Sequence, residues 1–415
     1  MVHQMMNTKI QNAASASKTN IHMTNRLPKF RQLLSLSLVV LLAACGTTPV
    51  EDSQVEHPPI SAAAWTDLLA WDATQTLPAA VQRPAAQWLP VHWADVPSVD
   101  QDTVEALLPA WLRSCVRPLQ ALVPWCARVR TLSLEGPEAS LRWLVGEWQP
   151  YQVRSLGGAD EGLLTGYFEP LLHATRQRDA SHTVALYATP QGWVRGQSWY
   201  TRQELDQNPA ALAALNGREL VWVSDPIDAL IAQIQGSARV LVREPDGQER
   251  TVRLAFAGHN GQEYQSVARW LMRQGEIRSA TWPVIKAWAA QNPSRVQAML
   301  WSNPRMVFFR EEALNGLDAQ GGPRGAQGVP LTPQRSIAVD KRSIPYGTPV
   351  WLSTQGPTLT TQRWVMAQDT GGAIQGAVRA DYFTGWGDEA RNMASTLKQS
   401  LHLWVLWPRG LTPPN

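Results

Sequence analysis

The apolar positions of this 415-residue chain follow a helical period in some segments and a strand-like pattern in others. Apolar residues spaced three and four positions apart predict helices over residues 104–113, 141–148, 266–273, 284–289 and 388–397. Pro109 and Pro118 fall within and after the first of these segments, so we expect the helices there to be short.

Runs of β-branched and aromatic residues between turns rich in Gly and Asp predict strands. The predicted strands cover residues 163–170, 183–188, 220–223, 231–234, 238–242 and 251–256, and most of 325–407. No internal repeat occurs, and no linker rich in Gly and Ser separates the parts. We therefore expect one domain to be inserted in another.

The N-terminal apolar run, from Leu33 to Ala44, follows three basic residues and is too short to span a bilayer. It ends Leu42-Ala43-Ala44-Cys45-Gly46, which is typical of a lipoprotein cleavage box. We interpret residues 1–44 as a lipoprotein signal peptide and Cys45 as the lipidated first residue of the mature chain. The alternative is an ordinary signal peptide with a chance cysteine. Met23 is an alternative start.

Removal of the signal peptide changes the charge of the chain. The full sequence has a formal charge of +3, and residues 1–44 hold five basic residues and no acidic ones, which leaves −2. No basic stripe occurs, so nucleic acid is not an expected partner. The roughly 370 remaining residues are too many for one small core, which favours two domains.

Cys115 and Cys126 are the two other cysteines. An exported chain matures in an oxidising compartment, so we expect a disulfide between them, with two buried thiols as the alternative. The eight histidines are scattered without metal-ligand spacing, and no metal or cofactor is expected. Twenty tryptophans suit stacking on sugar rings, although most indoles would pack in the protein.

Three aspartates near the C-terminus are the candidate chemistry. Asp340, Asp369 and Asp381 lie among strand-like residues, where Asp is unfavourable. No Gly-x-Ser-x-Gly turn or phosphate-binding loop competes with them. A carboxyl among apolar neighbours tends to keep its proton, as a general acid must. Any one of the three could equally be a turn residue, so the prediction depends on all three together.

These residues resemble motifs of the membrane-bound lytic murein transglycosylase A family, whose 3D module is named for three aspartates. The module is matched by Ala338-Val339-Asp340 with Ile344–Pro349, by Gln368-Asp369-Thr370-Gly371-Gly372-Ala373-Ile374 and by Arg379-Ala380-Asp381-Tyr382-Phe383. Upstream matches are Thr165–Pro170, Trp222 with Asp225-Pro226, Gln233–Ala238, Ala257–Gly261 with Tyr264, and Asn303-Pro304 with Val307–Phe309. The resemblance covers roughly residues 160–407. Ala238 departs from it, because the family usually has Gly there.

The resemblance implies a mainly β fold with peripheral helices. A double-psi β-barrel domain would hold the three aspartates, a smaller β-barrel-like domain would be inserted in it, and a groove would run between them. The implied boundaries are a tether at 45–61, a main domain built from 62–170 and 305–410, and an insert at 171–304.

The resemblance also implies a lytic exotransglycosylase, a lyase that cleaves the β-1,4 bond between N-acetylmuramic acid and N-acetylglucosamine in peptidoglycan and leaves 1,6-anhydromuramoyl ends. Asp381 would act as acid and then base, Asp369 would support it, and Asp340 would brace the barrel at the edge of the substrate site. The expected sugar-binding residues are Thr165, Tyr167, Gln235 and Ser237.

Two other functions stay open: a non-catalytic glycan-binding envelope lipoprotein, and a hydrolase in which Asp369 activates water. The expected partners are peptidoglycan strands, the membrane through the lipid anchor, and cell-wall synthesis or division proteins. Gly46 is not the retention-type Asp, so the expected location is the periplasmic face of the outer membrane.

Overall fold

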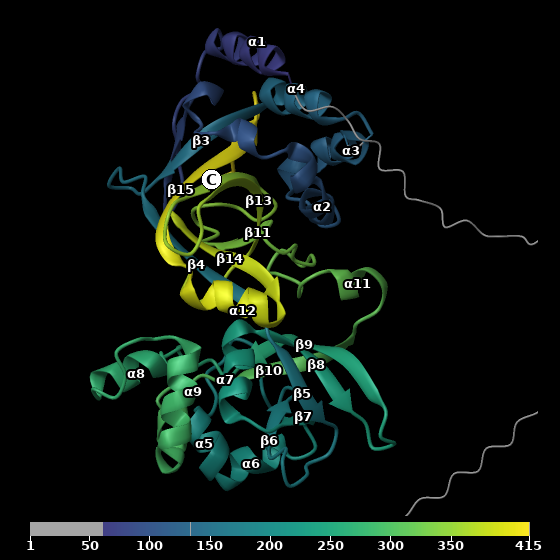
Figure 1. Ribbon diagram of the computed structural model, residues 1–415, viewed down its shortest axis with the longest axis vertical. Helices are drawn as coiled ribbons and strands as arrows, with labels where there is room; N and C mark the ends of the chain where they lie inside the picture. Colours follow the sequence, from purple (N-terminus) through teal and green to yellow (C-terminus); the bar gives the residue numbers. More distant parts are fainter. Residues whose placement is uncertain (1–60, 133, 415) are drawn as a thin grey trace, which may run out of the picture. The chain divides into compact units, whose positions relative to one another are not determined.

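The computed structural model describes residues 61–132 and 134–414 of the chain (Figure 1). The predicted signal peptide and the predicted lipidation site at Cys45 lie outside these residues. Across the described helices, none has the length and apolar character that crossing a bilayer requires.

The fold is mainly β with helices around two sheets, as the sequence predicts. The larger sheet has nine strands: β1 (Val81–Gln82), β2 (Gln87–Pro90), β3 (Trp148–Arg154), β4 (Gly162–Glu169), β11 (Ser336–Val339), β12 (Pro349–Thr354), β13 (Thr361–Asp369), β14 (Arg379–Trp386) and β15 (Lys398–Pro408).

The larger sheet contains a barrel, because its strand pairing returns on itself. β15 pairs with β12 along one edge, and with β3 and β4 along the other (Figure 1). The ring therefore runs β15-β12-β13-β11-β14-β4 and back to β15. The pairs β11–β13 and β14–β4 are parallel, and the other pairs of the ring are antiparallel.

The smaller sheet has six strands in the order β10-β9-β8-β5-β7-β6, all from the stretch between β4 and β11. Its last strand extends to residue 313 and pairs with β9, so the boundary expected at 304 falls short of the end of this sheet. The strands are β5 (Leu171–Thr175), β6 (Val184–Tyr187), β7 (Glu219–Val223), β8 (Ser237–Arg243), β9 (Glu249–His259) and β10 (Val307–Ala313).

Twelve α-helices accompany the sheets in the described residues. They are α1 (Ala62–Ala73), α2 (Val104–Ser114), α3 (Val123–Leu132), α4 (Pro137–Glu147), α5 (Arg202–Gln207), α6 (Pro209–Leu215), α7 (Pro226–Gln235), α8 (Val267–Arg273), α9 (Trp282–Gln291), α10 (Val296–Trp301), α11 (Gly316–Gln320) and α12 (Gly387–Thr396).

One local prediction is wrong. Residues 231–234, predicted as a strand, lie in α7, which begins after the N-cap Asp225 and ends at Gly236 in the left-handed conformation. Four residues, three of them apolar, are too few to distinguish a helix from a strand. The helix predicted over 104–113 is confirmed as α2, with Pro109 inside it. Just after α2, Cys115 forms a disulfide with Cys126 of α3, with the two Cα atoms 5.5 Å apart.

A buried ionic cluster lies where the chain passes from one sheet to the other. Only Pro170 separates β4 from β5. The last residue of β4, Glu169, is 0% exposed and accepts hydrogen bonds from Arg239 of β8 (2.8 Å) and Arg253 of β9 (2.6 Å). The Arg239 guanidinium also lies over the ring of Trp386, 3.8 Å from its centre. These contacts connect the end of β4 and the end of β14 to the smaller sheet.

Helix α12 packs closely on one face of β4 (Figure 1). At Gly166 an added Cβ would lie 2.8 Å from Cα of Ala394 in α12, closer than real Cβ atoms approach. Successive strand residues face opposite sides, so this packing leaves Thr165 and Tyr167 on the other face.

We expect Gly166→Ala to lower the free energy of unfolding by about 1–3 kcal/mol, because the added methyl would displace the α12 backbone. Denaturant unfolding measures this change. Gly146→Ala is the matched control, because an added Cβ in this helical position meets no atom within 4 Å. The control should be neutral or stabilising. Equal stability of the two variants would contradict the close packing of α12.

Candidate active site

Neighbouring strands of the barrel bring the predicted site residues into one row. Ala338 of β11 pairs in register with Asp369 of β13 on one side and with Asp381 of β14 on the other. Asp381 pairs in turn with Thr165 of β4. Residues in register on adjacent strands face the same side of a sheet, so both carboxyls lie on one face with the Ala338 methyl between them. Their Cα atoms are two strand spacings apart, roughly 10 Å.

A β-bulge places Asp369 in this row. The β11–β13 register shifts between Ile337 and Ala338, which leaves Gln368 without a paired residue. The Gln368 side chain is 0% exposed and donates hydrogen bonds to the Ala110 carbonyl (2.9 Å) and to Ser114 Oγ (2.7 Å). Helix α2 therefore anchors the bulge that positions the carboxyl.

Asp381 is connected to a cation through one hydroxyl. Arg379 Nη2 donates to Thr165 Oγ1 at 2.8 Å, and the same hydroxyl donates to Asp381 Oδ1. A guanidinium can only donate, so Thr165 must accept from Arg379 and give its single proton to the carboxylate. Burial raises the pKa of Asp381, whereas the Thr165 hydrogen bond and the Arg379 charge oppose the rise.

Asp369 is held by two donors. The Tyr167 hydroxyl donates to Oδ2 at 2.9 Å, and the backbone N–H of Ala326 donates to Oδ1 at 2.9 Å. Burial raises the pKa of Asp369 to about 6, and the negative charge of Asp381 adds to the rise, although these hydrogen bonds oppose it. Both aspartates are half-buried residues. Such raised carboxyl pKa values are typical of acid–base sites.

The third aspartate has a different environment. Asp340 is 5% exposed and accepts from the backbone N–H and the guanidinium of Arg342, and from the backbone N–H of Gly376 at 3.0 Å. The hydrogen bond from the Arg342 side chain is the main reason that the pKa of Asp340 falls to about 2. Asp340 thus ties the turn after β11 to the loop that leads into β14.

The four residues expected to bind sugar separate into two pairs. Thr165 and Tyr167 lie in the site, where they bond the two carboxyls. Gln235, at the end of α7, instead accepts from the backbone N–H of Phe168 at 3.1 Å, and Ser237 is 3% exposed. The sequence interpretation assigned no role to Arg379, although its position two residues before Asp381 places both on the same face of β14.

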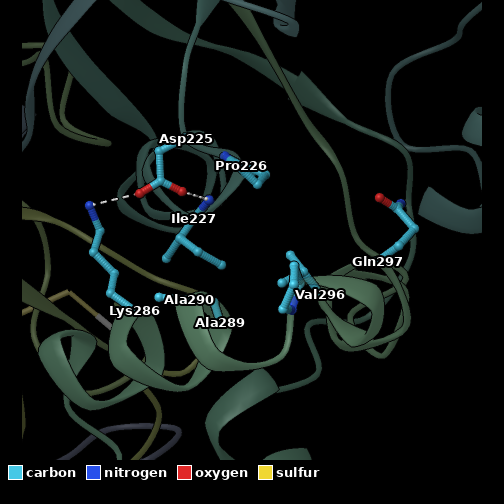
Figure 2. A pocket seen from close by; sticks show the side chains of 9 residues that line it. Asp225, Pro226, Ile227, Lys286, Ala289, Ala290, Val296 and Gln297 are labelled. Carbon is cyan, nitrogen blue, oxygen red and sulfur yellow. Dashed lines mark hydrogen bonds and ion pairs between the residues drawn. The ribbon is translucent and has the colours of Figure 1, made fainter. Parts of the chain in front are cut away.

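A separate open cavity of about 480 Å³ lies beside the start of α7 and contains none of the predicted site residues (Figure 2). Lys286, which lines this cavity, forms ion pairs with Asp225 at 3.0 Å and with Asp228 at 2.6 Å. In the described part of the chain, no group of three or more His, Cys, Asp or Glu side chains is placed to hold a metal ion.

Comparison with known proteins identifies relatives along most of the chain. Residues 163–310 match the MltA specific insert domain, and residues 335–407 match the 3D domain. Membrane-bound lytic murein transglycosylase A of Vibrio cholerae is 30% identical over 272 residues, which are 61% of this chain and 68% of that protein.

Two solved structures are similar as well. The lytic transglycosylase LtgG of Burkholderia pseudomallei is 42% identical, with a TM-score of 0.54 over 80% of this chain and 100% of that one. MltA from Neisseria gonorrhoeae is 26% identical, with a TM-score of 0.67 over 82% of this chain and 97% of that one. The chain described here therefore belongs to the membrane-bound lytic murein transglycosylase A family.

Proposed function

We propose that this protein is a lytic transglycosylase that cleaves the β-1,4 bond between N-acetylmuramic acid and N-acetylglucosamine in peptidoglycan and forms 1,6-anhydromuramoyl ends. The observation that carries the proposal is the row of Asp369, Ala338 and Asp381, in which burial raises the pKa values of both carboxyls. Membership of a family of lytic murein transglycosylases supports the same substrate.

A single carboxyl suffices for this reaction. The Asp381 carboxylic acid protonates the glycosidic oxygen on C4 of N-acetylglucosamine as its bond to C1 of N-acetylmuramic acid breaks. The resulting carboxylate then takes the proton from the muramic C6 hydroxyl, whose oxygen bonds to C1. No water is consumed. Attack within one sugar residue lowers the entropic part of the barrier, because nucleophile and electrophile are already joined.

We assign a supporting role to Asp369. Both of its oxygens already accept a hydrogen bond, from Tyr167 and Ala326, which favours a fixed charge over a base that activates water. The negative charge of Asp369 favours the protonated form of Asp381 nearby. Thr165 would hold the Asp381 carboxylate in position once its proton has left.

The remaining parts of the proposal concern architecture and location. We assign the ring of β4 and β11–β15 to a double-psi β-barrel, and β5–β10 to an inserted domain that offers the other side of the glycan site. The protein would be attached to the periplasmic face of the outer membrane through Cys45. The leader sequence and the family name support this location.

The mass of the released fragments separates this function from its alternatives. The mature protein is incubated with purified sacculi, and the soluble muropeptides are weighed. Anhydro ends support the lytic transglycosylase. Reducing ends, heavier by one water, would indicate a hydrolase, and intact sacculi that retain the protein would indicate a binding protein.

We expect Asp381→Asn to reduce cleavage by at least about 10²–10⁴-fold, the usual contribution of a general acid, while sacculus binding is kept. The rate of muropeptide release and a sedimentation assay with sacculi measure the two properties. Asp388→Asn is the matched control, because the Asp388 side chain is 84% exposed on α12. Cleavage that persists in the Asp381 variant would move the acid elsewhere.

We expect cleavage to decline as the pH rises through the raised pKa of Asp381. The first step needs the protonated Asp381 carboxyl, and burial raises the pKa of this group above that of a free carboxyl. The pH profile of kcat/KM measures this decline, and sacculus binding is followed over the same pH range. A rate that keeps rising to pH 8 would mean that the acid has a higher pKa than these carboxyls.

We expect Arg379→Gln to shift the decline of cleavage to higher pH by about one unit, because the Arg379 cation opposes the rise in the pKa of Asp381. Arg379→Lys keeps the charge and should restore most of the wild-type profile. A lower rate with an unchanged pH profile in the Gln variant would show that Arg379 only supports the fold.

A further inference from the structure

A second arginine reaches the edge of the site from the other sheet. Arg305 lies two residues before Val307, the first residue of β10, and its Nη1 is 3.8 Å from the position that a Cβ on Gly372 would take. Gly372 is an exposed residue of the loop that follows Asp369. The guanidinium therefore lies beside the loop that carries one of the two site carboxyls.

Buried polar side chains fix the backbone from which Arg305 projects. Asn260, 0% exposed, donates to the Pro304 carbonyl and accepts from the Met306 N–H at 2.9 Å. Arg202, also buried, donates to the Arg305 carbonyl at 2.6 Å and to the Asn303 carbonyl at 3.1 Å. The motifs around Asn260 and Asn303 thus hold the segment on both sides of Arg305.

The positive charge of Arg305 is not neutralised within the protein. Among the described residues, its guanidinium forms no ion pair or hydrogen bond, although burial lowers its pKa. Some shielded arginines of this chain have acidic partners, since Arg239 and Arg253 bond Glu169, whereas the buried Arg202 is satisfied by carbonyl oxygens. A partly desolvated cation without a counter-ion is costly unless a ligand completes it.

Two further basic groups lie close to Arg305. Burial lowers the pKa of His259, and the nearby charges of Arg305 and Arg195 lower it further. Within the described chain, none of these three side chains has a carboxylate within salt-bridge distance. His259 pairs in register with Val307, two residues after Arg305, so these side chains belong to one basic cluster in which the two arginines carry the charge. A carboxylate is the ligand that a guanidinium fork recognises best.

We propose that this basic cluster, through Arg305, binds a carboxylate carried on the lactyl group of the muramic acid residue. The inference rests on the proposed function, since it places that sugar over the neighbouring carboxyl row. The carboxylate has two sources: the free lactyl group of a peptide-free strand, and the peptide attached to it in an intact strand. Arg305 is a specificity residue and takes no part in proton transfer.

Equilibrium binding tests the proposal in an Asp381→Asn background, where strands are not consumed. Three ligands are compared by calorimetry: peptide-bearing glycan strands, amidase-treated strands with free lactyl carboxylates, and a hexamer of N-acetylglucosamine without any carboxylate. We expect Arg305→Gln to lower the affinity for carboxylate-bearing strands by about tenfold, the loss expected for one charge-assisted hydrogen bond. The affinity for the hexamer should not change. Arg305→Lys should be intermediate, because it keeps the charge without the fork.

Arg130→Gln is the matched control, because it removes the same charge from an exposed position on α3. Weakened binding of the amidase-treated strand alone assigns the free lactyl carboxylate, and weakened binding of the peptide-bearing strand alone assigns a carboxylate of the peptide. Weakened binding of both means that the cluster accepts either carboxylate. Equal affinity of the Gln variant and its parent for all three ligands overturns the inference, as does an equal loss for the hexamer. If the parent binds no glycan at all, the proposed function fails with it.

Discussion

A buried carboxylate at the junction of the two sheets is the constraint on which the site geometry depends. Glu169 ends β4 without any exposure, and its charge is compensated by Arg239 and Arg253 from the smaller sheet. Removing one partner of such a buried group typically costs about 3–5 kcal/mol, because the remaining charge stays unpaired. Thr165 and Tyr167 precede Glu169 on the same strand, so the cluster that fixes the end of β4 also fixes the residues that orient both site carboxyls.

The three aspartates show how environment separates residues of one type into different roles. Asp340 receives a guanidinium and backbone N–H groups, and its pKa falls to about 2, which suits a permanent anion that holds two loops together. Asp369 and Asp381 have no direct ion pair among the described residues, and burial raises the pKa of each. The distinction lies in the contacts of each carboxyl, since all three occur in similar strand-and-glycine sequence.

The sequence predicted most strands and the candidate aspartates, but not the contacts between them. The strand at 163–170 was predicted because its β-branched and aromatic residues form a long run, whereas the short apolar run at 231–234 carried no period and was assigned wrongly. The bulge at Gln368 and the pairing of Ala338 with both carboxyls depend on the register of three strands. The Arg379–Thr165 hydrogen bond joins residues 214 positions apart, which no local pattern encodes. The ionic and hydrogen-bonded part of the site therefore required the structure.

The closure of the barrel by its last strand has a consequence for biogenesis. Thr165 and Asp381 are 216 positions apart. Strand β4 also pairs with β15, which lies near the C-terminal end of the chain. A chain of such high contact order folds slowly and cannot complete its barrel while its C-terminal strands are still being synthesised. The polypeptide thus stays open until translation is nearly finished, a state compatible with threading through a translocation channel that accepts only unfolded chains.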